Sequence, residues 1–220
     1  GSGLVGSEMC IRDSTTYFGT LCGENVLVTS TGIGGPSAAI ALEELHMLGV
    51  DTIIRVGTCG GMQETVKSGD LIIATSAVRA EGTSKEYAPI ELPATADFEV
   101  TSALVKAATK LDEHYHTGII HSKDSFYGQH NPATMAVSYE LENKWKAFIK
   151  CGVLASEMET AALFTVSAVR NIRAGSILHA IWNQERRKSG DNSENINTEN
   201  AVLAAIEALK IIIAEDKMIN

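Results

Sequence analysis

The chain has 220 residues, of which 45% are hydrophobic and 20% charged, and its formal net charge at pH 7 is −9. This composition is typical of an ordinary soluble globular protein, and the acidic balance argues against a surface for nucleic acid or for an anionic membrane. The four cysteines show no CxxC pair and no metal-ligand spacing. They therefore favour a reducing, cytoplasmic location. No apolar run approaches the ~20 residues that a membrane-spanning helix needs.

Residues 1–14 differ from the rest of the chain because they show neither strand nor helix periodicity. We expect them to be a leader that is disordered or not native, and we expect residues 15–220 to form a single domain. From Thr15 the pattern becomes regular, with a short strand predicted over residues 15–19 and a buried strand over residues 25–30.

A glycine-rich stretch, TGIGGPS, follows over residues 31–37 and leads into a helix. Pro36 suits the first position of this helix, and Gly49 ends it. Such a turn before a helix can bind an anion, or its glycines can serve close packing of helix on strand. The dinucleotide fingerprint GxGxxG is not met, because Ser37 stands where the third glycine belongs, which disfavours a nicotinamide-dependent dehydrogenase.

The stretch DTIIRVGTCGG, residues 51–61, combines a buried strand, an arginine and a glycine-rich turn. A full positive charge at the end of a buried strand needs an anionic partner. One interpretation is a phosphate site, with Arg55 as a planar donor fork, the Thr58 hydroxyl, and backbone N–H groups around Gly57. The other is an arginine paired with a buried carboxylate beside an ordinary turn.

The middle of the chain continues the alternation of strands and helices. Strands are predicted over residues 71–78 and 116–122, a loop over residues 80–93, and a helix from Asp97, a good N-cap, to about Lys110. A strand over residues 175–182, a polar loop over residues 185–197 and a helix with apolar residues from Val202 to Ile213 complete the chain. This alternation indicates an α/β fold with a mainly parallel sheet.

Two aromatic residues and several polar ones follow the strand over residues 116–122, in the stretch SKDSFYGQHNP. A flat heterocycle needs a stacking face and an amide that donates and accepts, which Phe126 and Gln129 could provide. Lys123 and His130 lie in the same stretch. The alternative is a turn with one buried phenylalanine.

The stretch LASEMETAAL, residues 154–163, carries two carboxylates at a strand-to-helix turn. Ser156 and Glu159 match a capping box, which would give Glu159 a structural role. That motif does not account for Glu157, and two carboxylates at one turn could instead bind a diol through its hydroxyl groups.

Taken in order, STGIGGPS, RVGTCGG, SKDSFYGQH and SEMETAAL resemble the nucleoside phosphorylase family, and the resemblance runs from about Thr15 to the last helix. It implies a three-layer α/β/α fold with a central mixed, mainly parallel sheet. The pattern is most similar to members that cleave uridine, or deoxyuridine, with phosphate to give uracil and (deoxy)ribose 1-phosphate. The resemblance implies inorganic phosphate as co-substrate, no organic cofactor, and a homo-oligomer built from dimers, up to a hexamer.

The resemblance also assigns roles to individual residues. The phosphate-binding group is Arg55, Gly57 and Thr58, with Thr58 also near the ribose. Met158 and Glu159 would bind the ribose, Phe126 and Gln129 the pyrimidine base, and Ile33 and Ser37 a potassium ion at a subunit interface. Arg55, Thr58 and Glu159 would be the catalytic residues.

Three departures from the family pattern qualify this picture. Asn131 replaces an arginine of many uridine-cleaving members, so we expect Lys123 or His130 to supply a cationic donor to the base. Residues 181–184 lack the aspartate of purine-cleaving members, which favours a pyrimidine; a purine nucleoside phosphorylase or nucleosidase is the alternative. The family's first strand has no counterpart, so we expect the chain to be incomplete at its N-terminus, and an inactive nucleoside-binding chain is a further alternative.

Overall fold

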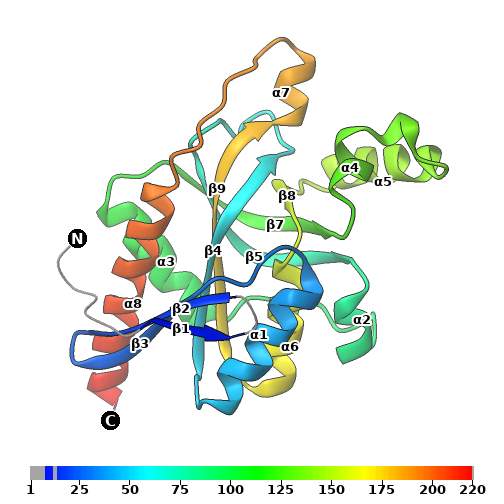
Figure 1. The fold of residues 1–220 in the computed structure, drawn as a ribbon. Helices are drawn as coiled ribbons and strands as arrows, with labels where there is room; N and C mark the ends of the chain where they lie inside the picture. Colours follow the sequence, from blue (N-terminus) through cyan, green and yellow to red (C-terminus); the bar gives the residue numbers. More distant parts are fainter. Residues whose placement is uncertain (1–7, 12–13, 220) are drawn as a thin grey trace.

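The computed structural model describes residues 8–11 and 14–219, which form two β-sheets with helices around the larger one (Figure 1). The larger sheet has the strand order β6-β5-β7-β8-β4-β9. Its strands are β4 (Thr52–Gly61), β5 (Leu71–Ala80), β6 (Ala94–Thr95), β7 (Tyr115–Lys123), β8 (Ala155–Glu157) and β9 (Arg173–Asn183).

The larger sheet is mixed, and its long pairings are parallel. β4 runs parallel to β9, and β7 runs parallel to both β5 and β8, whereas β8 is antiparallel to β4. The start of β5 also pairs antiparallel with β9, so the pairings from β5 through β7, β8, β4 and β9 return to β5. The predicted mixed, mainly parallel sheet is confirmed, and its closure through β5 and β9 is an addition that the sequence pattern did not indicate.

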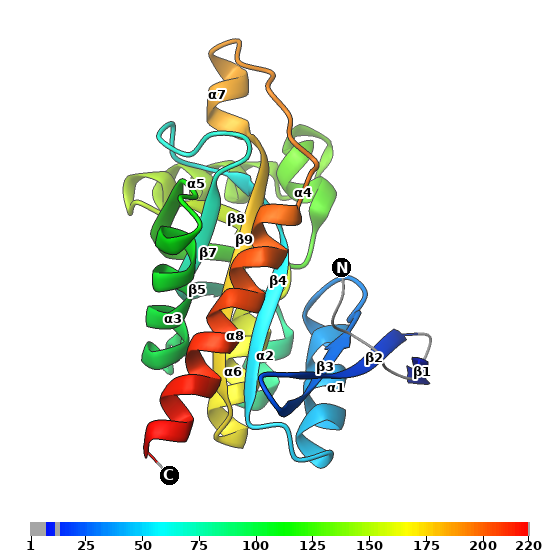
Figure 2. The same cartoon turned by 90° about the vertical axis from the view of Figure 1, so that its left-hand side faces the viewer.

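Helices cover both faces of this sheet and enclose two apolar cores (Figure 2). One core lies under α1 and α6, with Leu42 and Phe164 fully buried; the other lies under α3 and α8 around Leu104 and Ile177. The helices are α1 (Gly35–Met47), α2 (Thr83–Tyr87), α3 (Phe98–Lys110), α4 (Phe126–His130), α5 (Ser138–Lys150), α6 (Thr160–Arg170), α7 (Gln184–Lys188) and α8 (Glu199–Ile219), with a 3₁₀ turn η1 (Pro132–Thr134). The predicted three-layer arrangement is confirmed.

A separate three-stranded antiparallel sheet lies beside α1 and consists of β1 (Glu8–Ile11), β2 (Ser14–Leu21) and β3 (Glu24–Thr29). β1 falls in the segment that we expected to show no regular structure, and it pairs with β2. β3 was predicted as a buried strand, but its residues are exposed or only partly buried, because this small sheet stands apart from the main one. Residues 1–7 and 12–13 lie outside the described residues.

Three local predictions were wrong in detail. The glycine stretch after Arg55 is not a turn, because β4 continues as an extended strand through Gly61. The predicted loop over residues 80–93 contains α2, and the polar loop over residues 185–197 begins with α7, capped by the Asn183 side chain. Within the described ranges, no helix is both long and apolar enough to cross a membrane.

Candidate active site

The predicted site residues gather around β8, where it joins the C-terminal ends of β4 and β7. Gly60 of β4 lies opposite Ser156, and Ser122 of β7 lies opposite Glu157. The end of β9 is next to β4, with Gly61 opposite Asn183. Functional side chains collect at such strand ends because the following loops and helices leave a crevice there.

Arg55 lies between two carboxylates. Its Nη2 atom is 3.0 Å from Glu157 Oε2 and forms a second ion pair and hydrogen bond with Glu159. Burial would lower the pKa of Arg55, but the two carboxylates outweigh this effect and raise it, so the guanidinium stays charged. Its Nη1 atom is buried and has no hydrogen-bond partner among the described residues. Arg55 is therefore paired with carboxylates, as the second interpretation of this stretch had it, and its Nη1 atom remains a donor without an acceptor among the described residues.

Gly57 is needed because the Arg55 side chain extends over it along β4. A Cβ atom at this position would lie 2.8 Å from Arg55 Cζ and would overlap Nη1. Thr58, the next residue, is exposed, so its hydroxyl is accessible at the same strand end. The RVGT stretch therefore carries a guanidinium that is paired with carboxylates and an exposed threonine within one extended strand.

Glu157 fixes the start of α6. Its carboxylate accepts hydrogen bonds from the backbone N–H groups of Glu159, at 2.8 Å, and Thr160, at 2.9 Å, and from the Ser122 hydroxyl. Burial would raise the pKa of Glu157, but Arg55 and these donors hold it below its usual value. The predicted capping box between Ser156 and Glu159 is wrong, because α6 begins only at Thr160 with Glu159 as its N-cap residue, and the Ser156 hydroxyl donates to Gln129 instead.

Glu159 connects Arg55 to the glycine-rich turn before α1. Its Oε1 atom accepts a hydrogen bond of 2.6 Å from the backbone N–H of Gly34, and its Oε2 atom contacts Arg55. In the same turn the Ser37 hydroxyl is 2.9 Å from the Ile33 carbonyl oxygen. The two residues predicted for a potassium ion therefore bring two oxygen atoms together at the start of α1. Met158, between the two glutamates, is partly buried.

A polar network links the residues predicted for the base. The Ser156 hydroxyl donates to Gln129 Oε1 at 2.7 Å and accepts from Lys123 Nζ at 3.0 Å. Gln129 Nε2 donates to Gln184 Oε1 at 3.1 Å. Burial lowers the pKa of Lys123 to about 8, although Glu157 and Glu159 oppose the shift.

Aromatic rings lie beside this network. Phe126, which is 52% exposed, has its ring centroid 4.1 Å from that of His130, which in turn is 5.0 Å from the Trp182 ring. The Arg187 guanidinium lies over Trp182 at 4.9 Å. Burial, followed by the charges of Lys123 and Arg187, lowers the pKa of His130 and favours its neutral form. Lys123 is therefore the better candidate for the predicted cationic donor.

Sequence reasoning missed several members of the site. Ser156, Gln184 and Trp182 were not assigned to the base, and His121, whose Nδ1 atom is 3.1 Å from Ser156 Oγ, was not singled out. His121 is neutral at pH 7, because burial, aided by Lys123, lowers its pKa to about 4. All four lie in or directly after strands of the larger sheet, and that position is the signal that could have identified them.

Asn183 lies at the end of β9, within the segment 181–184 where the resemblance implies an aspartate in purine-cleaving members. Its amide nitrogen donates to the carbonyl oxygens of Gln63 and Val66, and its amide oxygen accepts from the N–H groups of Glu185 and Arg186. The side chain is buried and its four hydrogen bonds are structural.

Comparison with known proteins agrees with this geometry. Residues 5–214 match the family model described as the phosphorylase superfamily. The chain is 53% identical over 206 residues to a uridine phosphorylase of Treponema pallidum, covering 93% of this chain and 80% of the relative. A uridine phosphorylase of Thermococcus kodakarensis is 44% identical over 94% of this chain and 74% of its own length. A guanosine phosphorylase of Halorubrum lacusprofundi is 37% identical over 85% of this chain and 76% of its own length. The chain belongs to the phosphorylase superfamily.

Proposed function

We propose that this protein cleaves uridine with inorganic phosphate to give uracil and ribose 1-phosphate. The relatives named as uridine phosphorylases at 53% and 44% identity support the reaction. The observation that carries the mechanism is the pair formed by Arg55 and Glu159, in which one guanidinium nitrogen remains buried and finds no hydrogen-bond partner in the described part of the chain. Such a donor needs an acceptor, and a phosphate oxygen has the matching charge.

Phosphate would bind between Arg55 and the Thr58 hydroxyl. In the free protein Arg55 is held by Glu157 and Glu159, so its charge is already neutralised. Ribose hydroxyls that donate to Glu159 would compete for this carboxylate and release Arg55 toward the phosphate. Nucleoside and phosphate should therefore strengthen each other's binding.

Glu159, with Met158 beside it, would hold the ribose. Breaking the bond between ribose and base builds positive oxocarbenium character on the sugar. A carboxylate on the ribose hydroxyls orients the ring and favours that charge, while the phosphate is placed to attack C1′.

Gln129 and Phe126 would hold the uracil, with Lys123 as the cationic donor to the leaving group. Uracil departs as an anion, and a well-placed donor to such an anion is worth about 3–4 kcal/mol in a preorganised site. The hydrogen bonds of the Gln129 amide to Ser156 and Gln184 fix the orientation of the amide, so that its oxygen and nitrogen keep defined positions toward the base.

A purine substrate is the second candidate, because one of the matched relatives is named a guanosine phosphorylase. Asn183 argues against it, since a buried amide with four structural hydrogen bonds offers no acid to protonate a purine.

The remaining features belong to the same proposal. We infer that residues 15–220 form one catalytic domain that works in the cytoplasm as a homo-oligomer. A potassium ion would bind at the Ile33 carbonyl and the Ser37 hydroxyl.

A substrate panel tests the proposal. Uridine, deoxyuridine, thymidine, inosine, guanosine and methylthioadenosine are each incubated with the protein and phosphate, and the released base and sugar phosphate are measured. We expect uracil and ribose 1-phosphate from uridine at the highest kcat/KM. Faster turnover of guanosine or inosine would replace uridine as the assigned substrate.

A further inference from the structure

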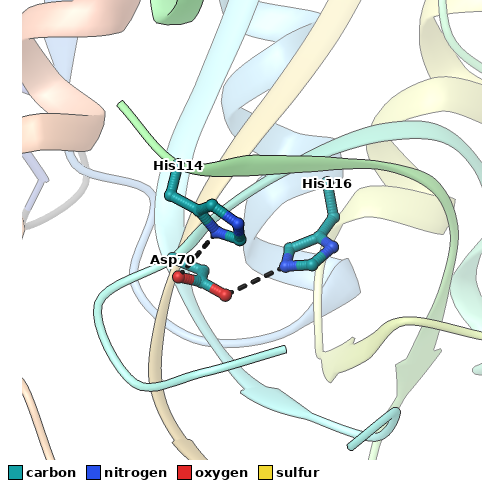
Figure 3. A group of neighbouring side chains, drawn as sticks. All are labelled: Asp70, His114 and His116. Carbon is teal, nitrogen blue, oxygen red and sulfur yellow. Dashed lines mark hydrogen bonds and ion pairs between the residues drawn. The ribbon is translucent and has the colours of Figure 1, made fainter. Parts of the chain in front are cut away.

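Asp70, His114 and His116 form a polar cluster outside the candidate active site. Asp70 directly precedes β5, His116 lies in β7, and His114 directly precedes β7 (Figure 3). Lys123, at the other end of β7, belongs to the candidate active site. A strand rises about 3.3 Å per residue, so the cluster lies roughly 25 Å from that site.

The three side chains direct their polar atoms at one another. His114 Nδ1 is 3.0 Å from Asp70 Oδ1, and His116 Nε2 is 2.9 Å from Asp70 Oδ2. Figure 3 shows the two imidazole rings beside each other and turned toward the carboxylate, with each ring in contact with a different oxygen atom. One donor atom from each residue can be chosen so that all three lie within 4.8 Å of one another.

The spacing of these atoms suits a divalent transition metal. Zn²⁺ binds histidine nitrogens and carboxylate oxygens at about 2.0–2.2 Å, which places neighbouring ligand atoms in a tetrahedral site roughly 3.4 Å apart. Two imidazoles and one carboxylate, with water in the fourth position, are a common ligand set for this ion. Hard cations such as Mg²⁺ and Ca²⁺ prefer oxygen ligands and fit two imidazoles poorly.

The surroundings support the carboxylate in one orientation and leave space for a fourth ligand. Asp70 is buried, and its Oδ2 atom accepts a hydrogen bond of 2.7 Å from the backbone N–H of Lys67. Hydrogen bonds of this kind to a ligating carboxylate fix its position in metal sites. The His114 side chain is 69% exposed, so an ion and its water can enter from solvent.

We propose that Asp70, His114 and His116 form a binding site for a divalent transition-metal ion, with Zn²⁺ as the best match. The ion would replace the two histidine–carboxylate contacts and link the loop before β5 to the start of β7. Asp70 also bonds through its carbonyl oxygen to the N–H of Ala180 in β9. The ion would therefore stabilise the place where three strands of the larger sheet meet.

Titration calorimetry with ZnCl₂ on the chelator-treated full chain tests this proposal. We expect one ion per chain, with binding weakened at least tenfold in both His114→Ala and Asp70→Asn. Substitutions that only reorient a metal ligand already cost about 10- to 100-fold in affinity. His114→Ala is the safer variant, because the exposed side chain contributes little to folding, and its melting temperature without metal verifies the fold.

The matched control is His46→Ala, which removes an exposed histidine from α1. It should bind Zn²⁺ as the unmodified chain does. The exposed thiols of Cys22 and Cys151 remain in every variant, so any binding by thiols is common to all of them. A rise in melting temperature with excess Zn²⁺ should appear in the unmodified chain and in His46→Ala, and be lost in His114→Ala.

Equal Zn²⁺ affinity in His114→Ala and the unmodified chain, or no binding to the latter, would overturn the proposal. The cluster would then be a carboxylate that only accepts hydrogen bonds from two imidazoles.

Discussion

Glu157 and Glu159 both contact Arg55, but their other partners differ. Glu157 is 4% exposed and accepts backbone hydrogen bonds that start α6, whereas Glu159 bonds to a single backbone N–H, that of Gly34. The first carboxylate is therefore committed to the fold, and the second can exchange its partners for ribose hydroxyls. Two acidic residues of one motif thus have separate tasks.

Replacing each glutamate with glutamine should separate these tasks. Glu159→Gln should lower kcat by about 10²–10³, the effect of losing one preorganised electrostatic group, with a small change in melting temperature. Glu157→Gln leaves the largely buried Arg55 with a weaker partner and should reduce the free energy of unfolding by about 3 kcal/mol. Steady-state kinetics and thermal melts of both variants provide the measurement. A Glu159→Gln protein that loses stability and keeps its turnover would contradict the assignment.

The lowered pKa of Lys123 leads us to expect that activity depends on pH. Burial lowers its pKa to about 8, so the ammonium is present below this pH and is lost as the pH rises through it. If the ammonium donates to the departing uracil, kcat/KM for uridine should fall above about pH 8.

Lys123→Met should be slower than the unmodified protein at pH 7 and should lack this decline. Ionisation of the uracil ring affects both proteins equally, so the difference between the two pH profiles reports Lys123. The control is Lys106→Met, which changes an exposed lysine of α3. If the pH profiles of kcat/KM had the same shape for Lys123→Met and the unmodified protein, Lys123 would not be the donor to the departing uracil.

At the scale of elements, β4 holds the residues that we propose to bind phosphate in an extended conformation. The side chain of Arg55 lies over Gly57 in the same strand, and Gly61 packs against Asn183, where a Cβ atom would lie 2.6 Å from the amide nitrogen. Glycines in this strand therefore allow the side chains of Arg55 and Asn183 to lie close to the β4 backbone.

Gly57→Ala should displace the Arg55 guanidinium, because the new methyl group would occupy the place of Nη1. We expect kcat/KM for phosphate to fall by about tenfold to a hundredfold with the α/β fold retained, as measured by kinetics and circular dichroism. Gly82→Ala is the matched control, since its added Cβ would be 3.6 Å from the nearest atom, Asp124 Oδ2. Unchanged phosphate kinetics in Gly57→Ala would show that Arg55 does not depend on this approach.

Most strands of the larger sheet and most helices around it could be predicted from the sequence, because buried apolar runs and N-cap residues such as Asp97 can be recognised locally. Prediction from the sequence failed where contacts between distant segments determine the local structure. The capping box at Ser156 was a sound local motif, but the Ser156 hydroxyl bonds instead to Lys123 of β7 and Gln129 of α4. The glycines after Arg55 suggested a turn, yet pairing with β9 keeps them extended. Gln184 directly follows β9, but its contact with Gln129 depends on how the strands are arranged in the sheet, which the local pattern does not give.

At the scale of the whole molecule, the small sheet presents apolar side chains to solvent. Tyr17 and Val28 are cross-strand partners in β2 and β3, and they are 47% and 53% exposed. On α1, Met47 is 79% exposed, and Ile33 in the preceding turn is 81% exposed. Exposed apolar patches of this kind mark interaction surfaces. They agree with the homo-oligomer that we propose.

Sedimentation equilibrium should therefore give a mass that is an even multiple of the 23.4 kDa chain. Val28→Lys places a charge on the apolar face and should shift the population toward the single-chain mass. Leu203→Lys, on the exposed side of α8, is the control and should leave the mass unchanged. A single-chain mass for the unmodified protein would contradict the proposed assembly.

The central claim is that this chain uses phosphate to cleave uridine at the site around Arg55 and Glu159. The most direct test is the absorbance change on release of uracil from uridine, recorded with and without inorganic phosphate. The account predicts release only with phosphate, together with an equal amount of ribose 1-phosphate. Release at the same rate without phosphate, with free ribose as the product, would make the protein a hydrolase, and no release from a cooperatively folded protein would contradict the assigned activity.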